Sequence, residues 1–389
     1  VALSALLLLG AGLFIHTLYN LQRVELGFNP NNLLLFTLRP VQSEYKAERL
    51  LRLYRQLFER LDQVPGVRSA TFGSVALIAN DNWYTDFRLP QEPEDAPGHE
   101  TMRQMIRENY FTTMEIPFLR GRQFTVHDGP SAPNVAIVNE TFVEKFFPGQ
   151  NVLGQRIIFS KRDVEVIGVA ADTKYESQRK EIKPLVYTPW QQEAETIGTM
   201  HFALRTDGEP TALAGAVRQA VRDIDTDLPV MNITSQTARA QATLGQERLY
   251  VRLLSFFGGV ALVLAAIGLF GVLAHSVSQR TKEIGIRMAF GARVSNVLRL
   301  VIWEGMKLVL LGLAFGTLLG IALQRLFAFH EFTADLWERM KDQLYGVSFG
   351  DPITLIAIVT LLMLVALIAC WLPARRAARI DPLVALRHE

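Results

Sequence analysis

Residues 279–293 read Gln-Arg-Thr-Lys-Glu-Ile-Gly-Ile-Arg-Met-Ala-Phe-Gly-Ala-Arg, and this basic segment lies between two stretches that are apolar enough to cross a bilayer. No residue between Arg252 and Arg280 is charged, and none is charged between Lys307 and Arg325. Basic loops between apolar segments are typical of the cytoplasmic surface of membrane proteins. We therefore expect the chain to be organised around a short loop with membrane on both sides.

The basic segment has the pattern of a short amphipathic helix. Its apolar residues Ile284, Met288 and Ala292 recur at helical spacing. Glu283 precedes Arg287 by four residues, which is the favourable order for an ion pair on a helix. Spacing alone leaves two interpretations open: a helix that lies along the membrane or docks on a partner, and a plain loop whose arginines only fix the topology.

The composition indicates a membrane protein. The 389 residues are 49% hydrophobic, which is high for a wholly soluble chain. A net charge of +2 is nearly balanced, so no nucleic-acid partner is expected. Cys370 is the single cysteine, which excludes an intrachain disulfide and a multi-cysteine metal site. Residue 1 is Val and no basic flank precedes the first apolar run, so we expect further chain upstream.

Four apolar segments are long enough for transmembrane helices, given a rise of about 1.5 Å per residue and a hydrocarbon core of roughly 30 Å. They are residues 1–22, 253–279, 300–327 and 352–374. The third contains Gly312, Gly316 and Gly320 at steps of four, which would let another helix approach closely, although ordinary glycine enrichment gives the same pattern. Glu304 and Lys307, near its start, are expected to pair or to reach the interface.

The loop charges predict the orientation. Basic residues dominate the segment 280–299 and the tail 375–389, so both are expected to be cytoplasmic. Acidic residues dominate the loop 328–351, which is expected to face outward. Alternation then places the large polar region 23–235 outside the membrane as well.

The polar region 23–235 predicts an α+β domain. Two strand–helix–strand patterns, near its start and its end, suggest a ferredoxin-like split βαβ subdomain, with a mostly-β subdomain inserted between them. Residues 236–252 read as a helical stalk to the membrane. The predicted fold is therefore an α-helical membrane protein with four spans and an external α+β domain.

The sequence offers no catalytic constellation. GxxxxGK[ST], HExxH and GxSxG are all absent, so no ATP hydrolysis, catalytic residue, metal or cofactor is expected in this chain. The pairs His127–Asp128 and His99–Glu100 are interpreted as solvated loop residues. The acidic residues around Glu92 lie in a polar loop without a partner base.

Several motifs resemble a known family. The run Glu283–Ala292 resembles the signature of FtsX-like, MacB-type ABC transporter permeases, and the tail Leu372–Arg387 resembles their closing motif. The polar region resembles the MacB-like periplasmic core domain. The motifs that carry this second likeness are Asn109-Tyr110-Phe111, Gly121-Arg122-Gln123-Phe124, Val138-Asn139-Glu140, Phe147-Pro148-Gly149, Leu153-Gly154 and Val166-Ile167-Gly168-Val169.

The resemblance implies a division of labour. A cytoplasmic coupling helix would receive force from a separate ATPase subunit that binds ATP, and the external domain would sense or grip cargo. The residues that this role falls on are Lys282, Glu283, Gly285, Ile286, Arg287, Met288 and Gly291. The resemblance also implies a location in the bacterial plasma (inner) membrane, in contact with its lipids. The opening of the chain resembles the second half of duplicated permeases, so a second permease half is an expected partner.

Two further hypotheses compete with a transporter permease. A membrane scaffold could use the same motion to regulate an external cell-wall hydrolase, and an anchored external enzyme is a third reading that lacks a catalytic constellation. The stretch 329–345 is longer and more charged than the family's short turn, so its role does not follow from the resemblance. The cargo does not follow from it either.

Overall fold

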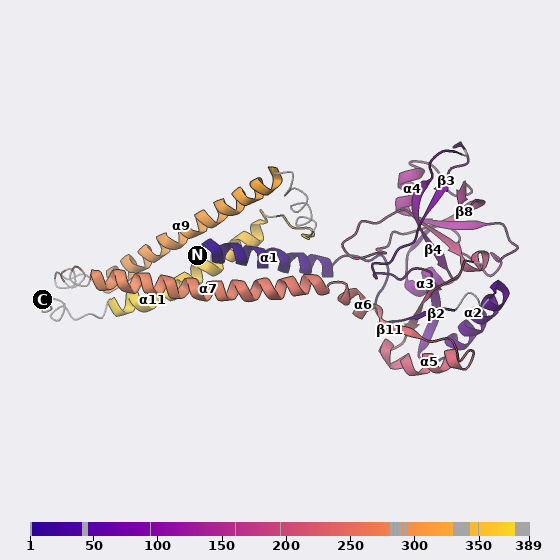
Figure 1. Ribbon diagram of the computed structural model, residues 1–389, viewed down its shortest axis with the longest axis horizontal. Helices are drawn as coiled ribbons and strands as arrows, with labels where there is room; N and C mark the ends of the chain where they lie inside the picture. Colours follow the sequence, from indigo (N-terminus) through magenta and orange to yellow (C-terminus); the bar gives the residue numbers. More distant parts are fainter. Residues whose placement is uncertain are drawn as a thin grey trace. The chain divides into compact units, whose positions relative to one another are not determined.

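The computed structural model describes residues 2–40, 46–93, 95–159, 161–194, 196–280, 283, 286, 290, 294–329, 343–348 and 350–377 (Figure 1). The chain divides into two compact units. The helical unit comprises Val1–Arg23 and Gly245–Glu389, and the sheet unit comprises Val24–Leu244.

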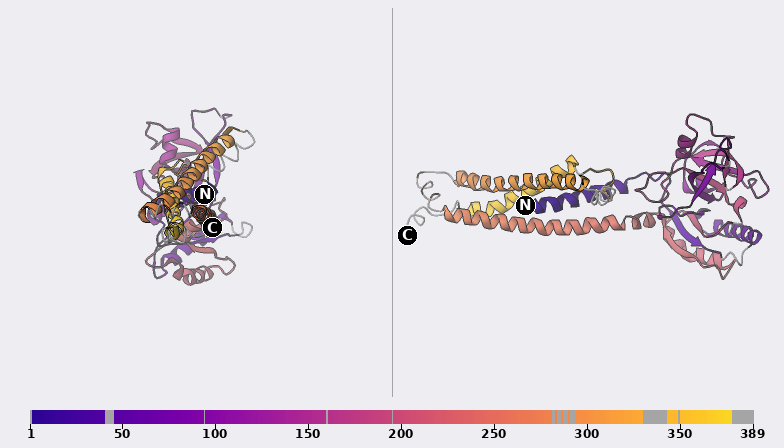
Figure 2. Two further views of the ribbon diagram at one scale, coloured as in Figure 1. Left: turned by 90° about the vertical axis from the view of Figure 1, so that its left-hand side faces the viewer. Right: turned by 45° about the horizontal axis from the view of Figure 1, so that its top comes forward.

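Long helices packed side by side make up the described part of the helical unit (Figures 1 and 2). They are α1 (Ala2–Gln22), α7 (Gly245–Gln279), α9 (Val294–Phe329) and α11 (Pro352–Ala377). Helix α1 contacts the other three, and α11 contacts both α7 and α9. Their shared core is apolar and includes Leu273, Leu313 and Cys370, all buried. The uncharged faces of these helices therefore pack on one another and form the core of the helical unit.

The outward faces of these helices are apolar as well. Phe256, Leu264 and Ile267 of α7 are all largely exposed, which suits lipid and not water. Within the described residues three helices are long and apolar enough to cross a membrane: Ala2–Gln22, Gly245–Gln279 and Pro352–Trp371. The predicted span 300–327 is helical as part of α9 but is not among these three. Between Lys307 and Arg325 it has 17 uncharged residues, at the short end of what crosses a bilayer.

The predicted stalk 236–252 is not one continuous helix. Helix α6 (Gln236–Ala242) ends first, and α7 begins at Gly245. The Thr243 hydroxyl lies 2.8 Å from the carbonyl oxygen of Ala240, so a side chain forms a hydrogen bond with a backbone carbonyl at the end of α6. A glycine follows at position 245, and glycine lowers helix propensity. The helical periodicity of the sequence did not show this break.

Four strands of the sheet unit form an antiparallel sheet in the order β11-β1-β10-β2. They are β1 (Leu33–Leu38), β2 (Val67–Gly73), β10 (Met200–Thr206) and β11 (Met231–Ser235). Helix α2 (Ala47–Asp62) connects β1 to β2, while η2 (Pro210–Leu213) and α5 (Ala214–Arg222) connect β10 to β11. The sheet thus contains two strand–helix–strand units.

Aromatic side chains fill the space between α2 and this sheet. The ring of Tyr54 lies 5.2 Å from that of Phe72 and 5.9 Å from that of Phe202, measured between centroids. The buried residues Leu57 and Leu61 continue the same stripe of α2, as its 3.6-residue periodicity requires. This cluster fixes the helix on the sheet.

The inserted strands close into a ring in the order β4-β3-β7-β8-β6-β9, because β9 also pairs in parallel with β4. They are β3 (Tyr84–Arg88), β4 (His99–Ile106), β6 (Val135–Asn139), β7 (Arg156–Phe159), β8 (Arg162–Ala170) and β9 (Leu185–Pro189). An apolar cluster that includes Phe87, Phe142 and Phe159 joins the ring to α4 (Glu140–Phe146). Strand β4 of the ring pairs with β2 of the first sheet at Ile106 and Gly73.

Candidate coupling site

The predicted coupling segment 280–299 joins α7 to α9. Of its described residues, Glu283 and Ile286 are helical, and the amide of Phe290 donates to the carbonyl of Ile286 at 3.0 Å. Five of the seven residues predicted for coupling, Lys282, Gly285, Arg287, Met288 and Gly291, lie outside the described residues. The Glu283–Arg287 ion pair therefore stays a prediction.

An ion pair connects the two helices that flank the segment. The Nη1 atom of Arg280, just after α7, lies 2.5 Å from Oε1 of Glu304 in α9. Lys307 does not pair with Glu304, which was one of the two alternatives that the spacing left open. Its ammonium lies 5.7 Å from the centroid of the Trp303 ring instead. The end of α7 and the start of α9 are thus held together across the coupling segment.

Apolar side chains are exposed at the same place. Phe290 is 89% exposed, and Ile286 and Trp303 are about half exposed. The start of α9 lines an open groove of about 730 Å³. The residues that line it are Ser295, Asn296, Leu298, Arg299, Leu300, Ile302, Trp303 and Met306. Exposed aromatic groups beside cations are typical of a surface that meets a protein partner or a membrane interface.

The predicted packing glycines all lie in α9. A Cβ on Gly316 would come within 3.2 Å of the Ala2 carbonyl oxygen and 3.5 Å of the Ala5 Cβ, so α1 passes close to this position. Gly312 is half-buried, and only the helical state of Gly320 is described. Their role in helix packing within a membrane stays a prediction.

A closer approach occurs at a glycine that the sequence analysis missed. A Cβ on Gly305 would lie 2.4 Å from Sγ of Cys370 in α11 and 3.0 Å from Cδ1 of Leu273 in α7. Gly305 precedes Gly312 by seven residues, which is two helical turns. Extending the glycine stripe backward by one heptad would have found it.

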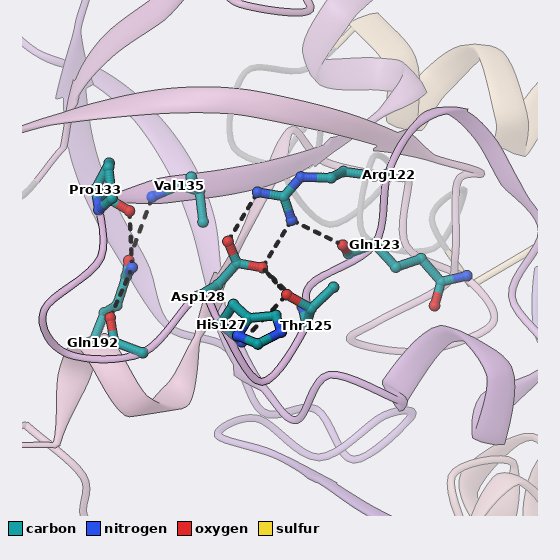
Figure 3. A network of polar contacts seen from close by, with 9 residues as sticks. Arg122, Gln123, Thr125, His127, Asp128, Pro133, Val135 and Gln192 are labelled. Carbon is teal, nitrogen blue, oxygen red and sulfur yellow. Dashed lines mark hydrogen bonds and ion pairs between the residues drawn. The ribbon is translucent and has the colours of Figure 1, made fainter.

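In the sheet unit, the Gly121-Arg122-Gln123-Phe124 motif fixes a loop through a buried carboxylate (Figure 3). Arg122 makes two parallel contacts to Asp128, Nη1 to Oδ2 at 2.8 Å and Nη2 to Oδ1 at 2.9 Å. The amide and hydroxyl of Thr125 also donate to Asp128 Oδ2. Asp128 is 5% exposed, so its interpretation as a solvated loop residue was wrong. The motif's arginine gives the carboxylate the partner that its burial requires.

The strand that packs against this motif explains why its first residue is a glycine. Gly121, the last residue of β5 (Phe118–Gly121), has φ +80° and pairs with Gly168 of β8. A Cβ on Gly121 would lie 2.1 Å from the Ile167 carbonyl oxygen. Only glycine satisfies both the backbone angle and the close approach. Two of the sequence motifs thus pack backbone to backbone.

A histidine and an acid singled out separately in the sequence contact each other. His99 Nε2 lies 2.7 Å from Oε1 of Glu92, so the acidic loop does have a partner base. Within the described residues, no three His, Cys, Asp or Glu side chains are grouped so as to hold a metal ion. His99 and Glu92 therefore have a structural role as partners of each other.

Family models match almost the whole chain. The model of the MacB-like periplasmic core domain matches residues 1–224, and that of the C-terminal part of FtsX-like permeases matches residues 255–382. The chain belongs to the FtsX-like permeases with a MacB-like periplasmic core domain. The second match contains the whole coupling segment, all of α9, and α7 from residue 255 onward.

Curated relatives of this FtsX-like permease are export proteins by name. The chain is 26% identical over 295 residues to the macrolide export ATP-binding/permease protein MacB of Mannheimia succiniciproducens, covering 73% of this chain and 43% of that protein. It is 29% identical over 296 residues to the probable syringafactin export ATP-binding/permease protein SyfD of Pseudomonas syringae pv. tomato, covering 73% and 42%. The chain thus spans less than half the length of these relatives.

Among solved structures, the periplasmic region of MacB from Actinobacillus actinomycetemcomitans matches with a TM-score of 0.38 and 17% identity, covering 57% of this chain and 97% of that one.

Proposed function

We propose that this FtsX-like permease is the membrane subunit of an ABC-type exporter. A separate ATPase binds the coupling segment 280–299, the membrane helices pass its motion across the bilayer, and the periplasmic core domain moves cargo on the other side. The observation that carries the proposal is the match to FtsX-like permeases over residues 255–382. Residues 1–389 contain no phosphate-binding loop motif, so ATP binding and hydrolysis are assigned to an ATPase outside these residues.

The geometry of the coupling site supports a docking role. Phe290 and Ile286 give a partner exposed apolar anchors between the two helix ends, and desolvated aromatic anchors dominate most protein interfaces. The contact between Arg280 and Glu304 ties α7 to α9 at this level. A push on the segment would therefore move both helices together.

We infer that α9 is a fourth span. It packs against α1 and α11 with a shared apolar core, and its uncharged run 308–324 is bounded by a lysine and an arginine, residue types that suit the ends of a span near the membrane interfaces. Four spans place the segment 280–299 and the tail in the cytoplasm of a bacterial cell, and the core domain outside its inner membrane. The exposed apolar faces of the helices are left for lipid and for a second permease half.

Charge reversal in the coupling segment tests the proposal. Glu283→Lys combined with Arg287→Glu should reduce the ATPase subunit that copurifies with the full chain by at least about tenfold, the effect of losing roughly 1.4 kcal/mol of binding. Efflux of test compounds should fall with it. Arg218→Glu, an exposed site of the sheet unit, is the matched control. Unchanged ATPase binding and efflux would contradict the docking role, and capture of a cell-wall hydrolase without any export would favour the scaffold hypothesis.

A further inference from the structure

The loop between β8 and β9, residues 171–184, contacts both places where the chain enters and leaves the sheet unit. The sheet unit begins at Val24 and ends at Leu244. The first connection, residues 24–32, follows α1, and the second connection, residues 236–244, precedes α7. Any motion that the membrane helices pass along the chain to the sheet unit goes through these two connections.

The first connection lies directly on the backbone of the β8–β9 loop. The Lys174 amide donates to the Leu26 carbonyl at 2.9 Å. Gly27 has φ +77°, and a Cβ there would lie 2.1 Å from the Asp172 carbonyl oxygen and 2.9 Å from the Thr173 Cα. Backbone meets backbone at this point, so displacement of one segment displaces the other.

The second connection is held by a buried side chain of the same loop. Gln178 is 6% exposed, and its Nε2 donates to the Ala240 carbonyl at 3.1 Å. The Thr243 hydroxyl lies 3.0 Å from Gln178 Oε1. The single hydroxyl hydrogen of Thr243 is shared between this oxygen and the Ala240 carbonyl, and both ends of the amide thus face residues that lead into α7. A buried glutamine without these partners would cost free energy, so the contact specifies the position of the connection.

The β8–β9 loop is anchored to the strand ring at its first residues. Asp172 Oδ1 accepts from Asn139 Nδ2 at 2.7 Å, and its Oδ2 accepts from the Thr141 hydroxyl at 2.6 Å. Asn139 also caps α4, accepting from the Phe142 amide at 3.1 Å. The carbonyl end of the same side chain accepts from the Leu185 amide, where the loop rejoins β9. The loop is thus fixed to the ring at both of its ends.

A third segment braces the middle of the loop. The amides of Ile78 and Asn80 donate to the carbonyls of Tyr175 and Glu176, at 2.6 and 2.9 Å. Gln236, fully buried at the start of α6, donates to the Leu77 carbonyl at 3.3 Å. The second connection therefore reaches the β8–β9 loop by two routes.

We propose that the β8–β9 loop is the element that makes both connections move with the strand ring, and that Gln178 and Gly27 are its positioning residues. Motion arriving from either membrane helix is passed to the ring through this loop, so the ring and the two connections move as one body. This inference rests on the proposed function for one point, that the motion starts at the membrane helices and serves export. The contacts themselves are independent of it.

Hydrogen exchange of the full chain in lipid nanodiscs tests this coupling. Gln178→Ala loosens the second connection, and exchange should become about tenfold faster in residues 236–244, as expected for loss of a buried hydrogen-bonded pair. It should also become several-fold faster in the first connection, residues 24–32, which Gln178 does not touch. Coupling is reciprocal, so Gly27→Ala should speed exchange in residues 236–244. Gln150→Ala, an exposed glutamine in the turn after α4, is the control and should change neither segment.

A change confined to residues 171–180 and 236–244 in Gln178→Ala would overturn the proposal, because it would reduce the residue to a local cap. If Gly27→Ala does not fold, Gln178→Ala alone decides the matter. An export assay separates this inference from the proposed function. Gln178→Ala should keep the copurifying ATPase while export falls. A wild-type chain that exports nothing would contradict the proposed function and leave the exchange result to decide the coupling.

Discussion

Asp128 is a carboxylate held almost out of water, and its surroundings predict how its loop responds to acid. The hydrogen bonds from Arg122 hold its pKa below the usual value, against the effect of burial. A carboxyl with a lowered pKa in the folded state stabilises the fold above its ordinary pKa of about 4, and the contribution is lost as the pH falls below that. Asp128→Asn should therefore lower the free energy of opening of residues 122–128 by about 1–2 kcal/mol at pH 7.

Native-state hydrogen exchange of the full chain measures this effect. The variant should also lose the pH dependence that the wild-type loop shows between about pH 5 and 3. Asp227→Asn, an exposed aspartate of the sheet unit, provides the comparison. Equal exchange of residues 122–128 in the two variants would contradict a stabilising role for Asp128.

His201 predicts a second dependence of stability on pH, this time from a side chain that is cationic when protonated. Burial lowers the pKa of His201 to about 4, although the Asp81 carboxylate 3.6 Å away acts in the other direction. The unfolded chain binds the proton near pH 6.5, so stability is complete above that value and falls as the pH drops toward 4, by about 3 kcal/mol at most. Exchange of β1 and β10 at pH 7 and pH 5 reports it. His201→Gln should flatten this dependence, and identical pH profiles would refute the assignment.

At this scale the sequence showed which residues belong together but not what they touch. The Arg122 motif was recognisable, whereas its partner Asp128 was assigned to solvent because a lone aspartate in a polar loop carries no sign of burial. Gln178 had no signal at all, since its partners lie 62 and 65 residues away in the chain. Long-range side-chain contacts do not leave a local pattern.

The approach of α9 to α11 can be tested with one thiol. A Cβ on Gly305 would lie 3.6 Å from the Cys370 Cβ, within the range of about 3.5–4.5 Å found in disulfides. Gly305→Cys should therefore form a bond to Cys370, the single native cysteine, upon mild oxidation. Mass spectrometry of the linked peptides and loss of maleimide labelling measure it.

The control is Gly271→Cys in α7, where no atom lies within 4 Å of the added Cβ. It should leave Cys370 free. Failure of the Gly305→Cys thiol to link, with the protein folded, would contradict the packing of α9 on α11.

Elements with strong periodicity were predictable and elements with mixed patterns were not. The stripe of α2 and the apolar strands β1 and β6 follow helical and strand patterns closely. Strand β4 was not predicted, and its first residues, His99 and Glu100, were wrongly interpreted as a loop. The strand buries Arg103 and Gln104 beside Met102 and Met105, so no alternation of polar and apolar residues remains. Arg103 is paired with Glu193 at 2.6 Å, which tertiary structure alone supplies.

For the whole molecule, the number of spans decides the topology. In a Cys370→Ser background, Asp227→Cys should react with an impermeant maleimide from outside the cell, and Glu283→Cys only after permeabilisation. If α9 crosses the membrane, Ser348→Cys is labelled from outside like position 227. Protection of position 348 in intact cells would instead leave three spans and place it inside.

The two-unit organisation was evident in the charge and hydropathy of the chain, but the ring of strands was not. Its closure depends on β9 pairing with β4 about eighty residues earlier, and strand partners this distant are not encoded by local periodicity. The β8–β9 loop owes its place between the two connections to the same closure. The contacts of this loop with both connections therefore arise only in the folded sheet unit.

The central claim is that an ATPase docks on the segment between α7 and α9, and a photo-crosslinking amino acid at position 290 tests it most directly. Phe290 is 89% exposed, whereas Phe257 of α7, half-exposed on an apolar face, serves as the lipid-facing control. In native membranes, the probe at 290 should capture an ATP-binding subunit that the probe at 257 does not. Capture of lipid alone at 290, or of a protein without an ATPase domain, would contradict the account.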